Sequence, residues 1–327
     1  MASDLPMVFQ IGKEVSFLEI VIIIFLVLLG FSFGVGGYLF FAACGRQDMD
    51  WLDETQAKKT PFGKFYSGIL LGHQWLQDNH AQDVFTTSHD GLKLHAYWVP
   101  AQHAKGTIVL VHGYHSCVMT DFSVAFPLYH EMGFNLLLPT QRSHGKSEGK
   151  YVTFGVHESQ DMLRWIEFHN ANFGPLPIIF SGMSMGASTV MYMADEPLPE
   201  NVKGLIADCG FTTPKEIISR VFTKMTHIPA WTVIWATSLF ARIFGRFHLQ
   251  QKDSTITLEK NSRPILLVHG MDDDFVPSYM TQKSFDACTG DKRLFLVEGA
   301  THGISFLRAK EQYIGHVMDL IQQCLEE

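Results

Sequence analysis

The stretch Ile178–Ser188, which reads IIFSGMSMGAS, joins an apolar run to a Gly-x-Ser-x-Gly pattern and then to small residues. This order predicts a buried strand, a sharp turn and a helix. In such a turn the central residue, Ser184, holds its hydroxyl above the end of the strand, because Gly182 and Gly186 leave space where a Cβ would clash with neighbouring backbone. An ordinary glycine-flanked turn would carry the same pattern, so the interpretation depends on finding chemical partners for Ser184.

A nucleophilic serine needs a base to take its proton and an acid to orient that base, and in this arrangement the acid precedes the base along the chain. Residues 264–270 form a β-branched apolar run that is followed directly by Asp272–Asp274. Residues 292–297 predict the next strand, and His302 follows shortly after it. The three chemical roles therefore fall at the ends of three predicted strands.

Two motifs in this region resemble those of the α/β-hydrolase superfamily: His-Gly-x-x-Asp-x-x-Val-Pro at His269–Pro277, and Gly-x-x-His at Gly299–His302. The resemblance extends from about residue 82 to the C-terminus and implies a catalytic triad of Ser184, Asp273 and His302. The chain is further similar to the single-pass membrane serine hydrolases of Gram-positive bacteria, through the segments Asp90–Leu94, Gln141–Gly149 and Ala207–Phe211.

The resemblance also implies an oxyanion hole made of two backbone N–H groups. One belongs to Met185, the residue after the nucleophile, and the other is expected from Tyr114, in the loop after a buried strand at 106–111. Many lipases carry glycines in that loop, so the Tyr114 ring is expected to line the pocket. Asp208 ends a predicted strand and is a rival for the role of the acid, although the motif favours Asp273.

Predicted strands and helices alternate along the chain, which indicates an α/β fold with a mostly parallel, doubly wound sheet. A hairpin at 83–88 and 92–99 opens the domain. Residues 212–251 interrupt the alternation before the strand that leads to Asp273, as a helical cap would. The cap's large apolar residues are expected to line or gate an acyl pocket, unless they only pack on the domain; they include Trp231, Trp235, Phe240 and Phe244.

Residues 20–44 carry no ionisable charge apart from a tyrosine and a cysteine side chain, and form a run that spans about 37 Å as a helix against a hydrocarbon core of about 30 Å. We expect a transmembrane helix, with a cleaved signal peptide as the alternative. Lys13 stands alone before the run, whereas Arg46 and several lysines follow it, which favours a cytoplasmic catalytic domain.

The chain therefore divides into residues 1–45, with the transmembrane helix at about 20–44, residues 46–80, and residues 81–327. Apolar residues recur every three or four positions in the second part, which predicts an amphipathic juxtamembrane segment. The third part is the predicted hydrolase domain, with its cap at about 212–251.

The formal net charge of −8 and the scattered basic residues make nucleic acid an unexpected partner. The five cysteines have neither disulfide-framework nor zinc spacing. His112 and His115 form a pair without a third ligand, and His144 lies in a loop that the resemblance identifies as a structural turn. We expect neither a metal nor another cofactor.

These observations predict a membrane-anchored serine hydrolase, a carboxylesterase that transfers the acyl group of a hydrophobic or medium-chain ester to water. Its partners would be a small ester or acyl substrate and the membrane. A serine peptidase or amidase acting on short peptides is the nearest alternative, because the same triad serves both reactions. A catalytically silent binding or scaffold protein is the alternative of another class.

Overall fold

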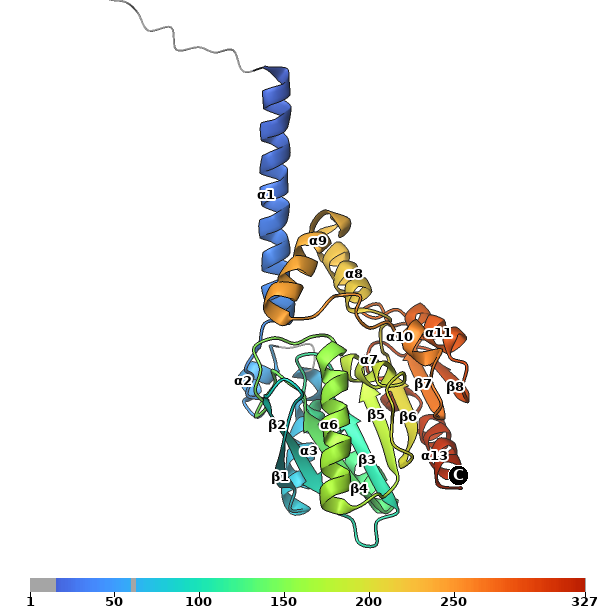
Figure 1. Cartoon of the computed structure of the whole chain (residues 1–327). Helices are drawn as coiled ribbons and strands as arrows, with labels where there is room; N and C mark the ends of the chain where they lie inside the picture. Colours follow the sequence, from blue (N-terminus) through green and yellow to red (C-terminus); the bar gives the residue numbers. More distant parts are fainter. Residues whose placement is uncertain (1–15, 60–62, 327) are drawn as a thin grey trace, which may run out of the picture.

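The computed structural model describes residues 16–59 and 63–326 of the chain, and within them a central sheet of eight strands in the order β1-β2-β4-β3-β5-β6-β7-β8 (Figure 1). The strand β2 is antiparallel to β1 and to β4, whereas β3 to β8 run parallel. The strands are β1 (Gln82–Thr87), β2 (Lys93–Val99), β3 (Gly106–Val111), β4 (Phe134–Thr140), β5 (Ile178–Met183), β6 (Val202–Asp208), β7 (Ile265–Gly270) and β8 (Lys292–Val297). The predicted fold class, a mostly parallel α/β sheet, is confirmed.

Helices cover both faces of this sheet, as a parallel sheet requires. Alternate residues of β3 face opposite layers: Ile108 and Leu110 join one buried cluster, and Val109 and Val111 join another. The first layer contains α3 (Tyr66–Asp78), α4 (Val118–Phe122), α5 (Phe126–Glu131), α12 (Ser305–Arg308) and α13 (Lys310–Glu326). The second contains α6 (Val156–Phe173), α7 (Met185–Tyr192), α10 (Ser254–Leu258) and α11 (Ser278–Ala287).

The expected amphipathic segment at 46–80 forms three short elements instead of one continuous helix. They are α2 (Glu54–Ala57), the 3₁₀ turn η1 (Gly63–Phe65) and α3. Ile69 and Leu76 of α3 are buried, and a Cβ on Gly72 would lie 2.6 Å from the Cβ of Ser123. The helix α3 therefore packs closely on the hydrolase fold; Phe62, which contributed to the predicted pattern, lies outside the described residues.

The helix α1 (Phe17–Cys44) projects away from the sheet (Figure 1). Ser16 and Glu19 cap its N-terminus reciprocally, through the bonds from Glu19 N to Ser16 Oγ and from Ser16 N to Glu19 Oε2. An 18-residue window of this helix has a mean hydropathy of 2.7 and no buried residue, so α1 is long and apolar enough to cross a membrane. Residues 1–15, including Lys13, lie outside the described part of the chain.

The C-terminal turns of α1 are part of the folded domain. Phe40 and Cys44 are fully buried, in a third apolar cluster that lies among the cap and the loops at the carboxyl ends of the strands. The chain after α1 pairs with the loop before α6, where Val152 N donates to Cys44 O at 2.7 Å and Arg46 N donates to Lys150 O at 2.9 Å. These contacts fix the end of α1 against the hydrolase domain.

The cap lies between β6 and β7 and consists of α8 (Pro214–Thr226), α9 (Trp231–Phe240) and the π-helical turn η2 (Ala241–Gly245). Figure 1 shows α9 beside the lower part of α1, with the connection from α8 directed along α1 and away from the sheet. The cap and α1 thus stand together over the carboxyl ends of the parallel strands.

Candidate active site

Ser184 lies at the turn between β5 and α7, in a conformation with φ 54° and ψ −114°. A Cβ on Gly182 would lie 2.2 Å from the carbonyl oxygen of Gly186, and a Cβ on Gly186 would lie 1.9 Å from the carbonyl oxygen of Val111. Both positions therefore require glycine for the close approach of the turn to α7 and to β3. The bond from Ser184 N to Asp208 O, at 2.8 Å, holds the turn against the next strand.

His302 connects Ser184 to Asp273. Its Nε2 lies 2.9 Å from Ser184 Oγ, and its Nδ1 lies 2.6 Å from Asp273 Oδ2. A proton on Nδ1 satisfies the carboxylate and leaves the lone pair of Nε2 free to accept the serine O–H. The structure therefore brings together the three residues that the sequence motifs select, in the order that a nucleophile, a base and an orienting acid would need.

Asp273 is buried and hydrogen-bonded through both oxygens. Oδ1 accepts from the backbone N–H groups of Phe275 and Val276 at 3.0 and 2.9 Å, and Oδ2 lies 3.2 Å from His269 Nε2 as well as near His302. Burial opposes ionisation, but the two histidines outweigh it and hold the pKa of Asp273 below its ordinary value. The carboxylate is therefore charged at neutral pH and can stabilise a protonated His302.

Asp208, the rival acid, occupies a different environment at the end of β6. Its Oδ1 accepts from Ser305 Oγ at 3.2 Å, and burial raises the pKa of its carboxyl group. The geometry at His302 Nδ1 favours Asp273.

The two expected oxyanion donors belong to the first residue of α7 and to the loop after β3. Within the described residues, neither Met185 N nor Tyr114 N donates a hydrogen bond to the protein. The loop that carries Tyr114 is fixed by its neighbours, because Gly113 N donates to Asp121 Oδ2 at 2.6 Å and His115 N donates to His144 Nε2 at 3.1 Å. Both N–H groups are therefore available to a ligand beside Ser184.

An apolar cavity of about 80 Å³ adjoins Ser184. Its walls come from the cap helix α8, from the loops after the strands and from α1; they include Ile217, Ile218, Val221, Tyr114, Phe154, Phe211, Phe275, Leu39 and Ala43. The expectation that Trp231, Trp235, Phe240 and Phe244 line this pocket is wrong. Phe240 and Phe244 pack against Phe40 and Phe41 of α1, and Trp235 packs against Phe33, so these aromatic rings join the cap to α1.

The contribution of α1 to the cavity was missed by the sequence reasoning, which assigned the helix to anchoring alone. A signal was present in the adjacent glycines Gly36 and Gly37, since small residues in an apolar helix permit close contact with another helix. A Cβ on Gly36 would lie 2.5 Å from the Cβ of Ala236 in α9. This contact sets Leu39 and Ala43, one and two turns further on, against the site.

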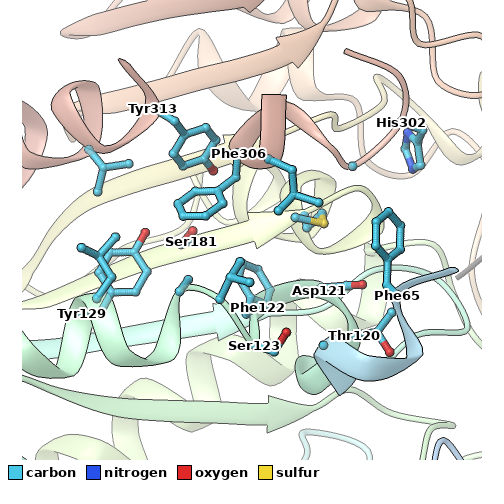
Figure 2. A pocket seen from close by; sticks show the side chains of 18 of the residues that line it. Phe65, Thr120, Asp121, Phe122, Ser123, Tyr129, Ser181, His302, Phe306 and Tyr313 are labelled. Carbon is cyan, nitrogen blue, oxygen red and sulfur yellow. The ribbon is translucent and has the colours of Figure 1, made fainter. Parts of the chain in front are cut away.

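A second cavity, of about 230 Å³, has His302 in its lining. Figure 2 shows His302 and Asp121 toward one end of this cavity, and Tyr129, Ser181 and Tyr313 toward the other. Burial raises the pKa of Asp121 to about 6, although its carboxylate accepts from Gly113 N and Ser116 Oγ. The lining is more polar than that of the cavity beside Ser184.

The other polar residues that the sequence analysis considered have structural partners. Buried Arg142 donates to both oxygens of Asp161 at 2.6 Å and also to Asp90. His144 is buried, with its Nδ1 2.8 Å from Arg142 O, and burial lowers its pKa to about 4. The loop 141–149 is thus held by buried hydrogen bonds, and in the described part of the chain its side chains form no hydrogen bond with Ser184, Asp273 or His302.

Cys209 is a neighbour of the site that the sequence reasoning did not identify. Its Sγ and ligand atoms of Asp273 and His302 lie within 4.8 Å of one another. The two oxygens of Asp273 already accept hydrogen bonds, and burial raises the pKa of the Cys209 thiol well above its ordinary value. The arrangement fits a hydrogen-bonded acid and base beside a neutral thiol better than it fits a set of metal ligands.

The chain resembles several proteins of known family or structure. A family model described as serine aminopeptidase, S33, matches residues 102–263. The uncharacterized protein YqkD of Bacillus subtilis is 24% identical over 232 residues, which are 71% of this chain and 76% of that protein.

Solved esterases share the fold. The Pyrococcus furiosus esterase Pf2001 superposes with a TM-score of 0.62 at 21% identity, over 76% of this chain and 93% of the esterase. The esterase EaEST of Exiguobacterium antarcticum superposes with a TM-score of 0.56 at 18% identity, over 74% of this chain and 100% of the esterase. With the sheet order and the turn at Ser184, these similarities show the α/β-hydrolase fold, and over residues 102–263 the chain is similar to a hydrolase family.

Proposed function

We propose that the chain is a serine carboxylesterase that acts through an acyl-enzyme on a hydrophobic ester. The observation that carries this proposal is the continuous hydrogen-bonded path from Ser184 Oγ through the His302 ring to Asp273, with distances of 2.9 and 2.6 Å. The apolar cavity beside Ser184 supports an acyl group as the part of the substrate that is bound there.

In the proposed reaction, Ser184 Oγ attacks the ester carbonyl carbon while its proton passes to His302 Nε2. The N–H groups of Met185 and Tyr114 stabilise the oxyanion. The bond to the alcohol oxygen then breaks, and Nε2 delivers its proton to the departing alcohol. Water attacks the acyl-enzyme by the same route, and the acid is released as the proton returns to Ser184.

The two cavities suggest how the ester is oriented. The apolar cavity at Ser184 would take the acyl chain, and the larger cavity beside His302 would take the alcohol that receives the proton. This assignment agrees with the chemistry of the base, because the leaving oxygen must lie within hydrogen-bond reach of Nε2.

A serine peptidase or amidase is the second candidate, and the serine aminopeptidase family model at residues 102–263 favours it. A panel of acyl esters and aminoacyl amides, measured with the same purified chain, separates the two reactions. Ester turnover that exceeds amide turnover for matched acyl groups supports the esterase. Turnover confined to the amides contradicts it.

We also propose that α1 stays attached as a single-pass anchor, with the catalytic domain on the cytoplasmic side. The burial of Phe40 and Cys44 supports an anchor over a cleaved signal peptide, because cleavage after the apolar run would remove both side chains from the apolar core. The basic residues that follow α1 support the cytoplasmic side. Protease digestion of the domain in intact cells would contradict this orientation.

A further inference from the structure

The helix α1 has two parts that differ in their surroundings. From Phe17 to Phe33 its large apolar side chains are exposed; for example, Phe25 is 62% exposed and Phe31 is 69% exposed. From Gly36 to Cys44 its inner face is buried against the protein. The outer part, up to Val35, is about 28 Å long at about 1.5 Å per residue, close to the thickness of a hydrocarbon core.

The cap helix α9 packs beside the junction between these two parts and runs parallel to α1. Near its start, Ser32 Oγ donates to Thr232 O, and further along the helix Thr237 Oγ1 donates to Gly36 O at 3.1 Å. At its end, the Phe240 ring lies 5.9 Å from that of Phe41. The start of α9 is therefore level with Ser32, inside the part of α1 that is exposed and apolar.

The last turn of α8, the connection and the first residue of α9 carry a group of exposed apolar side chains, which we call the cap tip: Met225 (77% exposed), Ile228 (46%) and Trp231 (75%). Figure 1 shows the connection alongside α1, on the side away from the sheet. Exposed apolar groups gathered in this way mark a contact surface, and tryptophans are typical of the membrane interface.

The charges of the cap also suit a membrane surface. No aspartate or glutamate occurs between Ile217 and Lys252, whereas this segment contains several basic residues. Arg242 and Arg246 are exposed, and within residues 16–59 and 63–326 neither forms an ion pair. Basic side chains beside apolar ones favour an interfacial location, and more so on anionic lipid.

An apolar seam connects the cap tip to the cavity beside Ser184. Leu39 of α1 and Val221 of α8 line that cavity. Leu39 also packs, together with Val35, against the buried cluster of Phe222, Ala230 and Val233 that lies under the tip. The helices α1 and α8, which line the cavity, therefore extend from it to the cap tip.

We propose that the cap tip inserts into the bilayer beside α1, and that the substrate is a fatty-acyl ester of that bilayer whose chain reaches Ser184 along the seam between α1 and α8. The cavity has room for a few methylene groups, so the remainder of a long chain would stay in the seam and in the lipid. The hydrolysis step rests on the proposed function, whereas the insertion of the cap tip does not.

The insertion is tested with the full-length chain in vesicles of phosphatidylcholine that carries bromine on its acyl chains, which quenches nearby tryptophan. We expect strong quenching of the parent protein, and much weaker quenching when Trp231 and Trp235 are both replaced by phenylalanine. The matched control is Trp75→Phe, because Trp75 packs against Phe126 within the hydrolase domain. Equal quenching in the parent and the double variant would overturn the insertion.

The route of the substrate is tested with two probes, 4-methylumbelliferyl oleate held in phosphatidylcholine vesicles and 4-methylumbelliferyl acetate in water. Met225→Asp and Ile228→Asp should each lower kcat/KM for the oleate by about tenfold or more, because an aspartate resists entry into hydrocarbon. Acetate hydrolysis should stay unchanged. The control is Met318→Asp, at an exposed position of α13, which should alter neither rate.

The outcomes separate the two proposals. Oleate hydrolysis that is unchanged in both tip variants overturns the membrane route, while acetate hydrolysis by the same proteins still supports the esterase. If the parent chain hydrolyses neither probe, the proposed function fails and the lipid substrate fails with it, even where the tryptophans are quenched. If the parent protein is not quenched and the tip variants change their oligomeric state, the cap tip forms a contact between copies of the chain. That result would overturn its insertion into the bilayer.

Discussion

The hydroxyl of Tyr114 donates a hydrogen bond of 2.7 Å to the carbonyl oxygen of Ala43, in the last turn of α1. Tyr114 belongs to the loop that we expect to supply one oxyanion donor, and its ring stacks with that of Phe154 at a centroid distance of 5.1 Å. Burial raises the pKa of its phenol, so the group remains a donor at neutral pH. One side chain thus links the apolar helix to the loop beside Ser184.

Tyr114→Phe keeps the ring in the cavity wall and removes this bond. We expect the unfolding free energy to fall by about 0.5 to 1.5 kcal/mol, because the Ala43 carbonyl loses its partner in a partly buried setting. We also expect kcat for esters to fall, since the loop is less firmly placed. Thermal unfolding in detergent and ester kinetics measure both effects.

The matched control for this variant is Tyr66→Phe, which removes a bond of 2.7 Å to the carbonyl oxygen of Leu52 and alters a side chain that lines neither cavity. It should leave kcat unchanged. Equal loss of kcat in both variants would show that the Tyr114 hydroxyl has no particular role in the site.

The two buried acids are separated by amide substitution. Asp273→Asn should lower kcat by about 10⁴-fold, by analogy with other triads, because the amide favours the wrong tautomer of His302. Asp208→Asn should have a much smaller effect, since the pKa of Asp208 is raised and its carboxyl lies beside Ser305. The kinetics of folded, purified variants decide, and the reverse ranking would transfer the role to Asp208.

The residues that shape the acyl cavity are tested through chain-length preference. Val221 lines the cavity and is only partly buried, so Val221→Phe should fill space without unfolding the cap. We expect kcat/KM for p-nitrophenyl esters to fall for longer acyl chains while acetate changes little.

Trp235→Ala is the comparison, because Trp235 lies outside the cavity wall and contacts α1. It should keep the parent's chain-length profile. A shift of the optimum in Trp235→Ala but not in Val221→Phe would restore the expectation that the cap aromatics line the pocket.

His115, in the Tyr114 loop, and buried His144, which accepts from His115 N, make stability depend on pH. Burial lowers the pKa of His144 to about 4 and that of His115 to about 4, compared with an ordinary value of about 6.5. Above pH 6.5 both are neutral whether the chain is folded or unfolded. Between about 6.5 and 4 only the unfolded chain binds the protons, so the unfolding free energy falls as the pH falls.

His144→Gln should reduce this pH dependence while keeping an acceptor near His115 N. The expected difference is on the order of 3 kcal/mol across that pH range for one fully shifted histidine. Denaturant unfolding at several pH values measures it, with His80→Asn as the exposed control. The same slope in the parent and in His144→Gln would contradict the account of this site.

Much of the fold could be predicted from the sequence, because each strand is a local apolar run bounded by turn residues. The predicted strands at 106–111 and 292–297 coincide with β3 and β8, and the strand predicted to end at Asp208 is β6. The convergence of Ser184, Asp273 and His302 was also predictable, since the carboxyl ends of parallel strands meet at one edge of the sheet.

The role of α1 in the cavity could not be predicted in the same way. An apolar helix face has the same composition whether it meets lipid or protein, so the glycine pair Gly36 and Gly37 is the one local sign of a helix contact, and the other buried residues of α1 resemble the exposed ones. The direction of Trp235 and Phe244 depends on the same long-range contact with α1. Only the arrangement of the cap against α1 shows which apolar residues face Ser184.

The central claim, that Ser184 is the nucleophile, is tested most directly by locating the adduct of a fluorophosphonate probe by mass spectrometry of the full-length chain. We expect the modification on Ser184, and its loss in a folded Ser184→Ala variant together with all ester turnover. Labelling that persists in Ser184→Ala, or an adduct on Ser181 or Ser188, would contradict the account.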